Sequence, residues 1–449
     1  MQPSCKAIAV AFLAAVFVPG ATALTWAVPQ QQAAQAQQQK PNYTLAEYNA
    51  YQAAHNEKDP QMKLKDLDDF VMKFPGSALL MYIYGDYEST YFALKNYPKT
   101  IEYADKLLAL PNVDLGTRLQ TLGYRAQAML YGSADKELQT QDAYTKAKDA
   151  SAQGLQTLSQ WQKPQNMADD QFNNNKKALG VLFNSVAGIA ESGLKDYKGA
   201  ADSYKAVLAL DPSDAVTHFR LGVAYLQEMP PDAPDGFWEL SRSIALKGPG
   251  EAQVRTYLRN QLLHYQMLAC DNLADDEINQ MITLAGTTSD RPASMTIPSA
   301  DDLQKARDDT ADFLPWLQEG GEHGRVMWLA TCGSEYPDVG VKVLDIMPTD
   351  NDNFTLKVYR PAAADPDAAA KEMDAATMPN MEIHIVMQPD VKRLMKDDAV
   401  RFTGTLKGYQ QSPFMLTWEN GKVNPEDLQP APSGGKRPAR TAAPKRPGA

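Results

Sequence analysis

A 34-residue repetition of small residues constrains the fold of this chain more than any other sequence feature. Ala187-Gly188 is followed 34 residues later by Leu221-Gly222. Around both sites, apolar and small residues recur every three or four positions, which is the spacing of one face of an α-helix. Pro212 lies between the sites and ends a helix there, because proline lacks the amide hydrogen that a helix interior needs. This period predicts stacked pairs of helices that bury their apolar faces against one another.

The clearest unit, residues 178–214, resembles a tetratricopeptide (TPR) repeat. Counted from Val181, small residues occupy the eighth and twentieth positions, an aromatic residue the twenty-fourth and proline the thirty-second, as in the family. The resemblance implies that the small residues let paired helices approach closely and that the aromatic residue fills the space between pairs. The unit is degenerate, because it departs from the family at Asn184, Glu191 and His218. The repeat-defining positions are Gly188, Ala200, Tyr204, Pro212, Leu221, Gly222 and Tyr225.

Weaker copies of the pattern predict further helix pairs. Residues 44–77 give one pair, and residues 79–112 give another with a turn at Lys95-Asn96. Leu122-Gly123 marks the first helix of a third pair, whose long second helix covers roughly residues 137–161. We therefore expect about five helix pairs between Leu45 and Thr283.

The TPR resemblance also implies a binding surface, since the first helices of such repeats line a concave groove. Packing between helices is the alternative role for each groove position. The run of Tyr82, Tyr84, Tyr87 and Tyr91 has the spacing of a core stripe rather than of a cofactor site. The predicted groove residues are Tyr82, Ser89, Phe92, Ser185, Ile189, Phe219, Val223 and Gln227.

The C-terminal part has a different periodicity. Five segments alternate with period two or run apolar, as expected for strands. A short helical segment at residues 390–395 lies between the third and fourth strands, so the order is similar to that of an OB-fold barrel, with an immunoglobulin-like or other small sheet as the alternative. Asn420-Gly421 is typical of a tight hairpin turn. The predicted strands are residues 339–347, 353–359, 381–387, 399–409 and 413–423.

The N-terminus predicts export. Lys6 precedes a run of twelve apolar residues, and Ala21-Thr22-Ala23 supplies a small-residue cleavage pattern, which is the layout of a signal peptide. The apolar run is shorter than the roughly 20 residues of a membrane span. We expect cleavage after Ala23, with Ala27 or an uncleaved anchor as alternatives, and a periplasmic or secreted mature protein without a membrane span.

Changes in composition divide the chain into seven segments. Gln/Ala-rich sequence follows the leader and has nothing to bury in a core. The last segment is basic and Pro-rich, and we expect it to be disordered. The segments are residues 1–23 (signal peptide), 24–42 (linker), 43–285 (helical repeats), 286–298 (linker), 299–331 (helical connector), 332–428 (β-rich domain) and 429–449 (tail).

Charge and motif content restrict the function. The net charge of -11 argues against nucleic acid as a partner, because phosphate binding needs an excess of Lys and Arg. Cys270 and Cys332 are too few for a disulfide scaffold, and we expect two separately buried thiols, with one disulfide as the alternative. The histidines are scattered, and no metal-ligand, nucleophile or phosphate-binding motif occurs, so we expect no metal, no cofactor and no enzyme.

These features favour a non-catalytic scaffold of the cell envelope that binds a protein or peptide through a TPR groove. The alternative is a polysaccharide- or nucleic-acid-binding protein that acts through the C-terminal barrel. The barrel residues available for that role are Lys342, Lys357, Tyr359, Arg360, Arg401 and Lys407.

Overall fold

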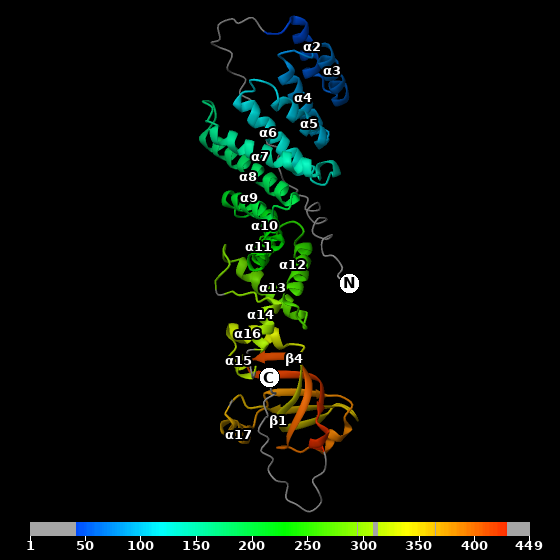
Figure 1. Ribbon diagram of the computed structural model, residues 1–449, viewed down its shortest axis with the longest axis vertical. Helices are drawn as coiled ribbons and strands as arrows, with labels where there is room; N and C mark the ends of the chain where they lie inside the picture. The colour runs from blue at the N-terminus through cyan, green and yellow to red at the C-terminus, as the bar shows by residue number, and fades with distance from the viewer. Residues whose placement is uncertain (1–41, 294, 309–312, 364, 429–449) are drawn as a thin grey trace, which may run out of the picture. The chain divides into compact units, whose positions relative to one another are not determined.

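The fold combines an array of helices with a C-terminal barrel (Figure 1). The computed structural model describes residues 42–293, 295–308, 313–363 and 365–428. Contacts divide the chain into two compact units, Met1–Thr256 with Met281–Pro292, and Tyr257–Gln280 with Ala293–Ala449. The predicted fold class, helix pairs followed by a small β-barrel, is confirmed. The predicted signal peptide and basic tail lie outside the described residues.

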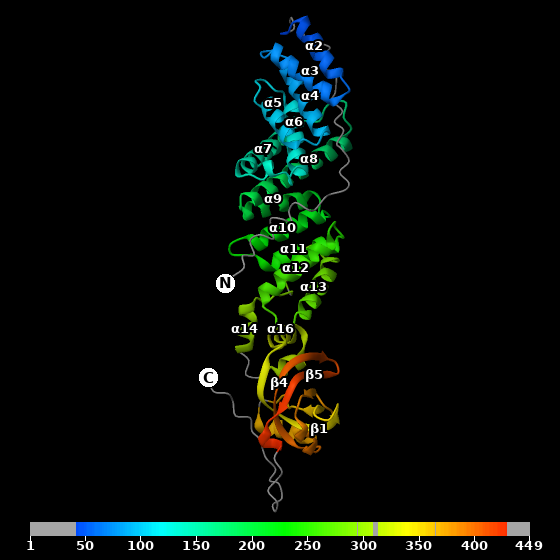
Figure 2. The same ribbon diagram turned by 90° about the vertical axis from the view of Figure 1, so that its right-hand side faces the viewer.

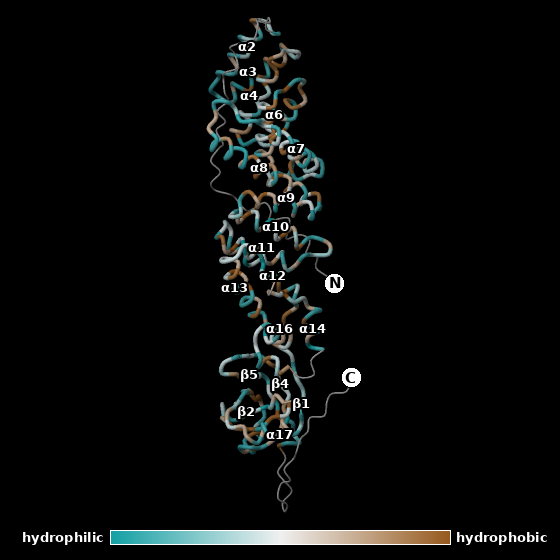
Figure 3. The backbone as a smooth tube through the Cα atoms, turned by 90° about the vertical axis from the view of Figure 1, so that its left-hand side faces the viewer, coloured by the Kyte–Doolittle hydropathy of each residue, from teal (hydrophilic) through white to brown (hydrophobic). Residues whose placement is uncertain are grey.

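Five consecutive helix pairs make up most of the described part of the first unit, and each helix packs against the next (Figure 2). Hydrophobic and hydrophilic stretches alternate along these helices in Figure 3, as amphipathic helices require. Both α12 (Glu251–Gln266) and α13 (Asn272–Ala285) contribute residues to both units. The five pairs are α2 (Leu45–Asn56) with α3 (Pro60–Lys73), α4 (Leu80–Ala93) with α5 (Tyr97–Leu108), α6 (Leu115–Tyr131) with α7 (Gln141–Gln160), α8 (Asp169–Gly193) with α9 (Tyr197–Leu210), and α10 (Ala215–Gln227) with α11 (Ala233–Ala245).

Two of these helix pairs have the same type of turn between their helices. Lys95 has a φ of 57° and Lys195 a φ of 64°, so each lies in the left-handed region just after the first helix ends. The next residue in each case, Asn96 or Asp196, accepts a hydrogen bond from an amide in the first turn of the second helix. The same side-chain cap therefore begins α5 and α9, which confirms the turn expected at Lys95-Asn96.

Small residues allow close packing within the repeat. A Cβ atom at Gly188 would overlap the ring of Tyr204, which is fully buried together with Ala200. Tyr204 also packs against Leu221 of the next pair. In that pair, a Cβ atom at Gly222 would lie 2.8 Å from a backbone oxygen of α11. Glycine at these two positions thus lets paired helices approach to a distance that alanine would prevent.

A disulfide joins Cys270 to Cys332 in the second unit, so the expectation of two separate thiols is wrong. Their Cα atoms are 5.9 Å apart and the residues are separated by 62 positions. The bond connects the loop after α12 to the residue that follows α16 (Gly321–Thr331). Both cysteines are buried, with Leu273, Leu303 and Leu329, in one apolar cluster. Sequence spacing gave no sign of this proximity, because packing of the intervening helices brings the two residues together. These helices are α13, α14 (Ala300–Asp308), α15 (Leu314–Glu319) and α16.

Five strands close into a barrel with the order β1-β2-β3-β5-β4, in which β3 and β5 are parallel and the other neighbours antiparallel. This is the strand order of an OB-fold, so the OB-like expectation is confirmed over the immunoglobulin-like alternative. Alternate residues of each strand point inward around Phe402 and Trp418, which are fully buried. The strands are β1 (Glu335–Pro348), β2 (Phe354–Tyr359), β3 (Met381–Ile385), β4 (Ala399–Gln411) and β5 (Phe414–Val423). The connections include α17 (Pro366–Ala375), η3 (Pro389–Arg393) and, after β5, η4 (Pro425–Leu428).

The expected hairpin turn at Asn420-Gly421 is wrong, because both residues lie within β5. Asn420 has a φ of 54° at a point where the pairing of β5 with β3 and with β4 shifts register. A β-bulge needs the same positive φ as a tight turn, so asparagine and glycine suit both. Gly421 is also required sterically, since a Cβ atom there would lie 2.9 Å from Ile385.

Candidate functional site

The predicted groove residues divide into a buried and an accessible set. Four of them, on α8 and α10, are buried, so neighbouring helices cover most of each side chain. Ser89, Phe92 and Gln227 are half-buried, and Tyr82 is 51% exposed. The most accessible aromatic surface of the predicted set therefore lies on α4. The buried residues, which offer little contact area to a partner, are Ser185, Ile189, Phe219 and Val223.

One aromatic cluster lies at the start of α4 and is called here the first aromatic cluster: Tyr48, Tyr51 and Tyr82. The ring centroids of Tyr51 and Tyr82 are 5.8 Å apart, and those of Tyr48 and Tyr51 are 6.5 Å apart. Burial, followed by the charge of Asp86, raises the pKa of Tyr51 to about 12, so its hydroxyl stays protonated at neutral pH. Asp86 is already paired, with its Oδ2 atom 2.9 Å from the Nδ1 atom of His55.

A second aromatic cluster lies at the other end of α4 and consists of Phe92, Tyr97, Tyr124 and Tyr131. Phe92 is at its centre, with ring centroids 5.4 Å from Tyr124, 6.0 Å from Tyr97 and 6.1 Å from Tyr131. The cluster draws on α4, α5 and α6, and Tyr131 is 41% exposed. Burial raises the pKa values of Tyr124 and Tyr131. Tyr124 and Tyr131 therefore present neutral hydroxyls.

Glu88 adjoins the second aromatic cluster and is buried without a charge partner among the described residues. Its side chain lies one helical turn before Phe92 on α4, and its charge contributes to the raised pKa of Tyr124. Only 3% of Glu88 is exposed, and among the described residues no donor bonds its Oε1 atom. Burial raises the pKa of Glu88 well above its ordinary value. An enclosed carboxyl oxygen without a donor is costly in a native protein and calls for a specific explanation.

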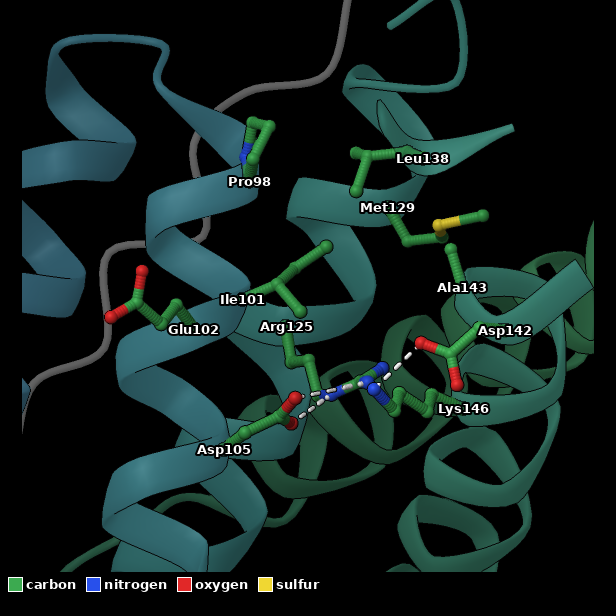
Figure 4. Close-up of a pocket in the computed structure, with 10 residues that line it drawn as sticks. All are labelled: Pro98, Ile101, Glu102, Asp105, Arg125, Met129, Leu138, Asp142, Ala143 and Lys146. Atoms are coloured by element: carbon green, nitrogen blue, oxygen red, sulfur yellow. Dashed lines mark hydrogen bonds and ion pairs between the residues drawn. The ribbon is translucent and has the colours of Figure 1, made fainter. Parts of the chain in front are cut away.

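Residues of α5, α6 and α7, with Leu138 from the short 3-10 helix before α7, line a cleft that contains two ion pairs (Figure 4). Its volume is about 260 Å³. The Nε atom of Arg125 donates to Asp105 at 2.6 Å, and Lys146 pairs with Asp142 at 2.7 Å. Both cations of the lining are therefore neutralised within the chain. The lining residues are Pro98, Ile101, Glu102, Asp105, Arg125, Met129, Leu138, Asp142, Ala143 and Lys146.

Two of the barrel cations considered for polymer binding are held by partners within the chain. The Nζ atom of Lys342 donates to the carbonyl of Met373 at 3.0 Å and lies 3.1 Å from Asp397. Arg401 contacts Asp427 and Glu426 at 3.1 and 3.0 Å. These pairings reduce the positive charge that a polyanion needs.

The β2–β3 face of the barrel, where OB-folds commonly bind polymers, carries acidic groups. His384 lies 2.8 Å from Glu419 and 3.0 Å from Glu382. Burial lowers the pKa of His384, but hydrogen bonds to these two carboxylates raise it more, so the net shift is upward. The face therefore combines opposite charges rather than presenting a basic surface. The other candidates remain in the barrel region, with Lys357 and Tyr359 on β2, Arg360 just after it and Lys407 on β4.

Within the described ranges, no group of three or more His, Cys, Asp and Glu residues is placed to hold a metal ion. No helix there is both long and apolar enough to cross a membrane.

The fold and site define a helical-repeat protein with a C-terminal OB-like barrel. No family model matches the chain, and no curated protein matches it. Solved structures that match include the C-terminal part of a TPR repeat-containing protein from Cytophaga hutchinsonii, at 15% identity and a TM-score of 0.23, over 54% of this chain and 95% of that chain. A likeness of this degree carries no argument, so the class rests on the helix pairs and the barrel themselves.

The sequence analysis missed most members of the two aromatic clusters. It identified Tyr82 and Phe92 but not the rings that contact them. A signal was present, because Tyr124 and Tyr131 are seven residues apart and fall on one side of α6. Leu122-Gly123 had already placed this stretch on a first helix, so the groove prediction could have been extended to both residues. Glu88 carried no signal, since an isolated glutamate in a helix is usually solvated.

Proposed function

We propose that this chain is a non-catalytic scaffold of the cell envelope that binds a protein or peptide partner through the first helices of its helix pairs. The observation that carries the proposal is the pair of aromatic clusters on α2, α4, α5 and α6, with Tyr82 and Tyr131 about half exposed. Tyrosine is favoured at protein interfaces, because it combines a large apolar ring with a polar hydroxyl. Aromatic clusters on an array of helix pairs suit an extended segment of another protein.

Two features support a location outside the cytoplasm. The N-terminal sequence has the layout of a signal peptide. The Cys270–Cys332 disulfide suits an oxidising compartment, since reducing systems keep cytosolic thiols free. In the proposed role, the barrel is a second docking module.

The proposal is tested by crosslinked capture with the mature chain in its native host. A double variant, Tyr82→Ala with Tyr131→Ala, removes one accessible ring from each cluster. Met72→Ala is the matched control, because Met72 is 75% exposed on α3 and belongs to neither cluster. We expect the double variant to lose specific partners that the wild type and the control retain, with circular dichroism unchanged. Retention of every partner by the double variant refutes the proposed binding surface.

Location is tested separately, by fractionating host cells that produce the full chain. Recovery of a shortened chain outside the cytoplasm, with an N-terminus following Ala23, supports the proposal. Recovery of the full-length chain in the cytoplasm contradicts it.

A further inference from the structure

We propose that the second aromatic cluster and Glu88 together form a receptor for one lysine or arginine side chain of the protein partner. The inference rests on the proposed function, since it assigns a chemistry to the partner of that same surface. It begins from a buried acid that has no countercharge within the described part of the chain, beside rings of a kind that can bind a cation.

Glu88 is the first part of the argument. Other acids near α4 have partners: Asp86 lies 3.3 Å from the Nζ atom of Lys63, and Asp68 accepts a hydrogen bond from Tyr87. Glu88 has no ion pair among the described residues, although it is only 3% exposed. Such a carboxyl gains from a cation brought by another molecule, because the pairing offsets its desolvation.

The rings are the second part. A cation within about 6 Å of a ring centroid is attracted by the negative face of that ring. Among the described residues, cation–π contacts occur at Tyr103, Phe172 and Tyr225, and at no ring of the second aromatic cluster. The described cations therefore leave these four rings unoccupied, and Tyr131 is 41% exposed to solvent.

Charge complementarity determines the kind of partner. The whole chain carries a net charge of -11, which favours approach of a basic segment. The long apolar stems of lysine and arginine suit a site whose entrance is aromatic, because the stem packs on the rings while the charged end reaches the carboxylate. An acidic or neutral segment would leave Glu88 unpaired and buried more deeply still.

The test is a selection of peptides by the full mature chain. Immobilised protein is offered a random library of twelve-residue peptides, and the frequencies of Lys and Arg are compared before and after selection. Affinities of recovered peptides are then measured beside versions in which the basic residue is replaced by norleucine or citrulline. The protein variants are Glu88→Gln, which keeps the shape and removes the charge, and Met72→Ala as the control. Circular dichroism melts establish that each variant is folded.

Enrichment of Lys or Arg, with a loss of roughly tenfold or more in affinity on either neutral replacement or in Glu88→Gln, supports the inference. The peptide replacements leave the protein unaltered, so they decide the question even if Glu88→Gln fails to fold. Selection of peptides without basic enrichment, or equal affinity for the neutral versions, overturns the inference and leaves the proposed function standing. Failure to select any peptide, combined with failure to capture any partner, overturns both.

Discussion

Removal of the Cys270–Cys332 disulfide is expected to destabilise the second unit selectively. The perturbation is a double variant, Cys270→Ala with Cys332→Ala. The two residues are separated by 62 positions, and cross-linking a loop of that length lowers the entropy of the unfolded chain by an amount worth about 4 kcal/mol at 25 °C. Both sulfur atoms lie in an apolar cluster, so alanine leaves no unsatisfied polar group there.

The assay is urea unfolding of the mature wild type and the variant, and calorimetry is a second, separate measurement. Two compact units predict two transitions, which must be separated before a free energy is assigned. With a slope of about 2 kcal/mol per molar urea, the loss corresponds to a shift of about 2 M in the midpoint of the second unit. The transition of the first unit should not move.

Two results would refute this reasoning. The first is an unchanged midpoint for the second unit in the variant or in wild type treated with a reductant. The second is the detection of two free thiols per mature chain when the wild type is unfolded without reductant, since Cys270 and Cys332 are the cysteines beyond the predicted leader.

Three further outcomes are expected. Gly188→Ala should lower the stability of the first unit by about 1–3 kcal/mol in calorimetry, because its Cβ atom meets the Tyr204 ring, whereas Gly76→Ala has open space and serves as the control. Phe219→Asp buries a charge at a position that is 3% exposed, so it should unfold the helix pair and not only weaken binding. A loss of helical circular dichroism checks this prediction. Burial raises the pKa of Glu88 in the folded protein above its ordinary value of 4.5. The protonated carboxyl therefore contributes fully to the free energy of unfolding below about pH 4.5, and this contribution is lost as the pH rises through the folded pKa. Urea midpoints for wild type and Glu88→Gln should therefore diverge with rising pH in favour of the variant, and parallel curves would contradict this.

The periodic parts of the fold were predictable from the sequence. The five strands and the main helix pairs follow local patterns, period two in β2 and period 3.6 in α8 and α9. The close approach at Gly188 was expected from the resemblance to a TPR repeat, which implies small residues where paired helices meet.

The remaining features depend on contacts between elements distant in sequence. The disulfide, the pairing of Lys342 with Asp397 and the meeting of Phe92 with Tyr124 all join such elements. The prediction of a hairpin turn at Asn420-Gly421 was wrong for another reason. A tight turn and a β-bulge require the same backbone conformation and differ only in how the flanking residues pair.

The disulfide also determines how the chain responds to mechanical force. Tension applied to the two ends of the chain passes through the Cys270–Cys332 bond and bypasses the 61 residues between them. Fully extended, a segment of that length would span roughly 200 Å. An oxidised molecule stretched to its limit is therefore shorter than a reduced one by about that length, and the helices α13 to α16 are not extended by the applied force.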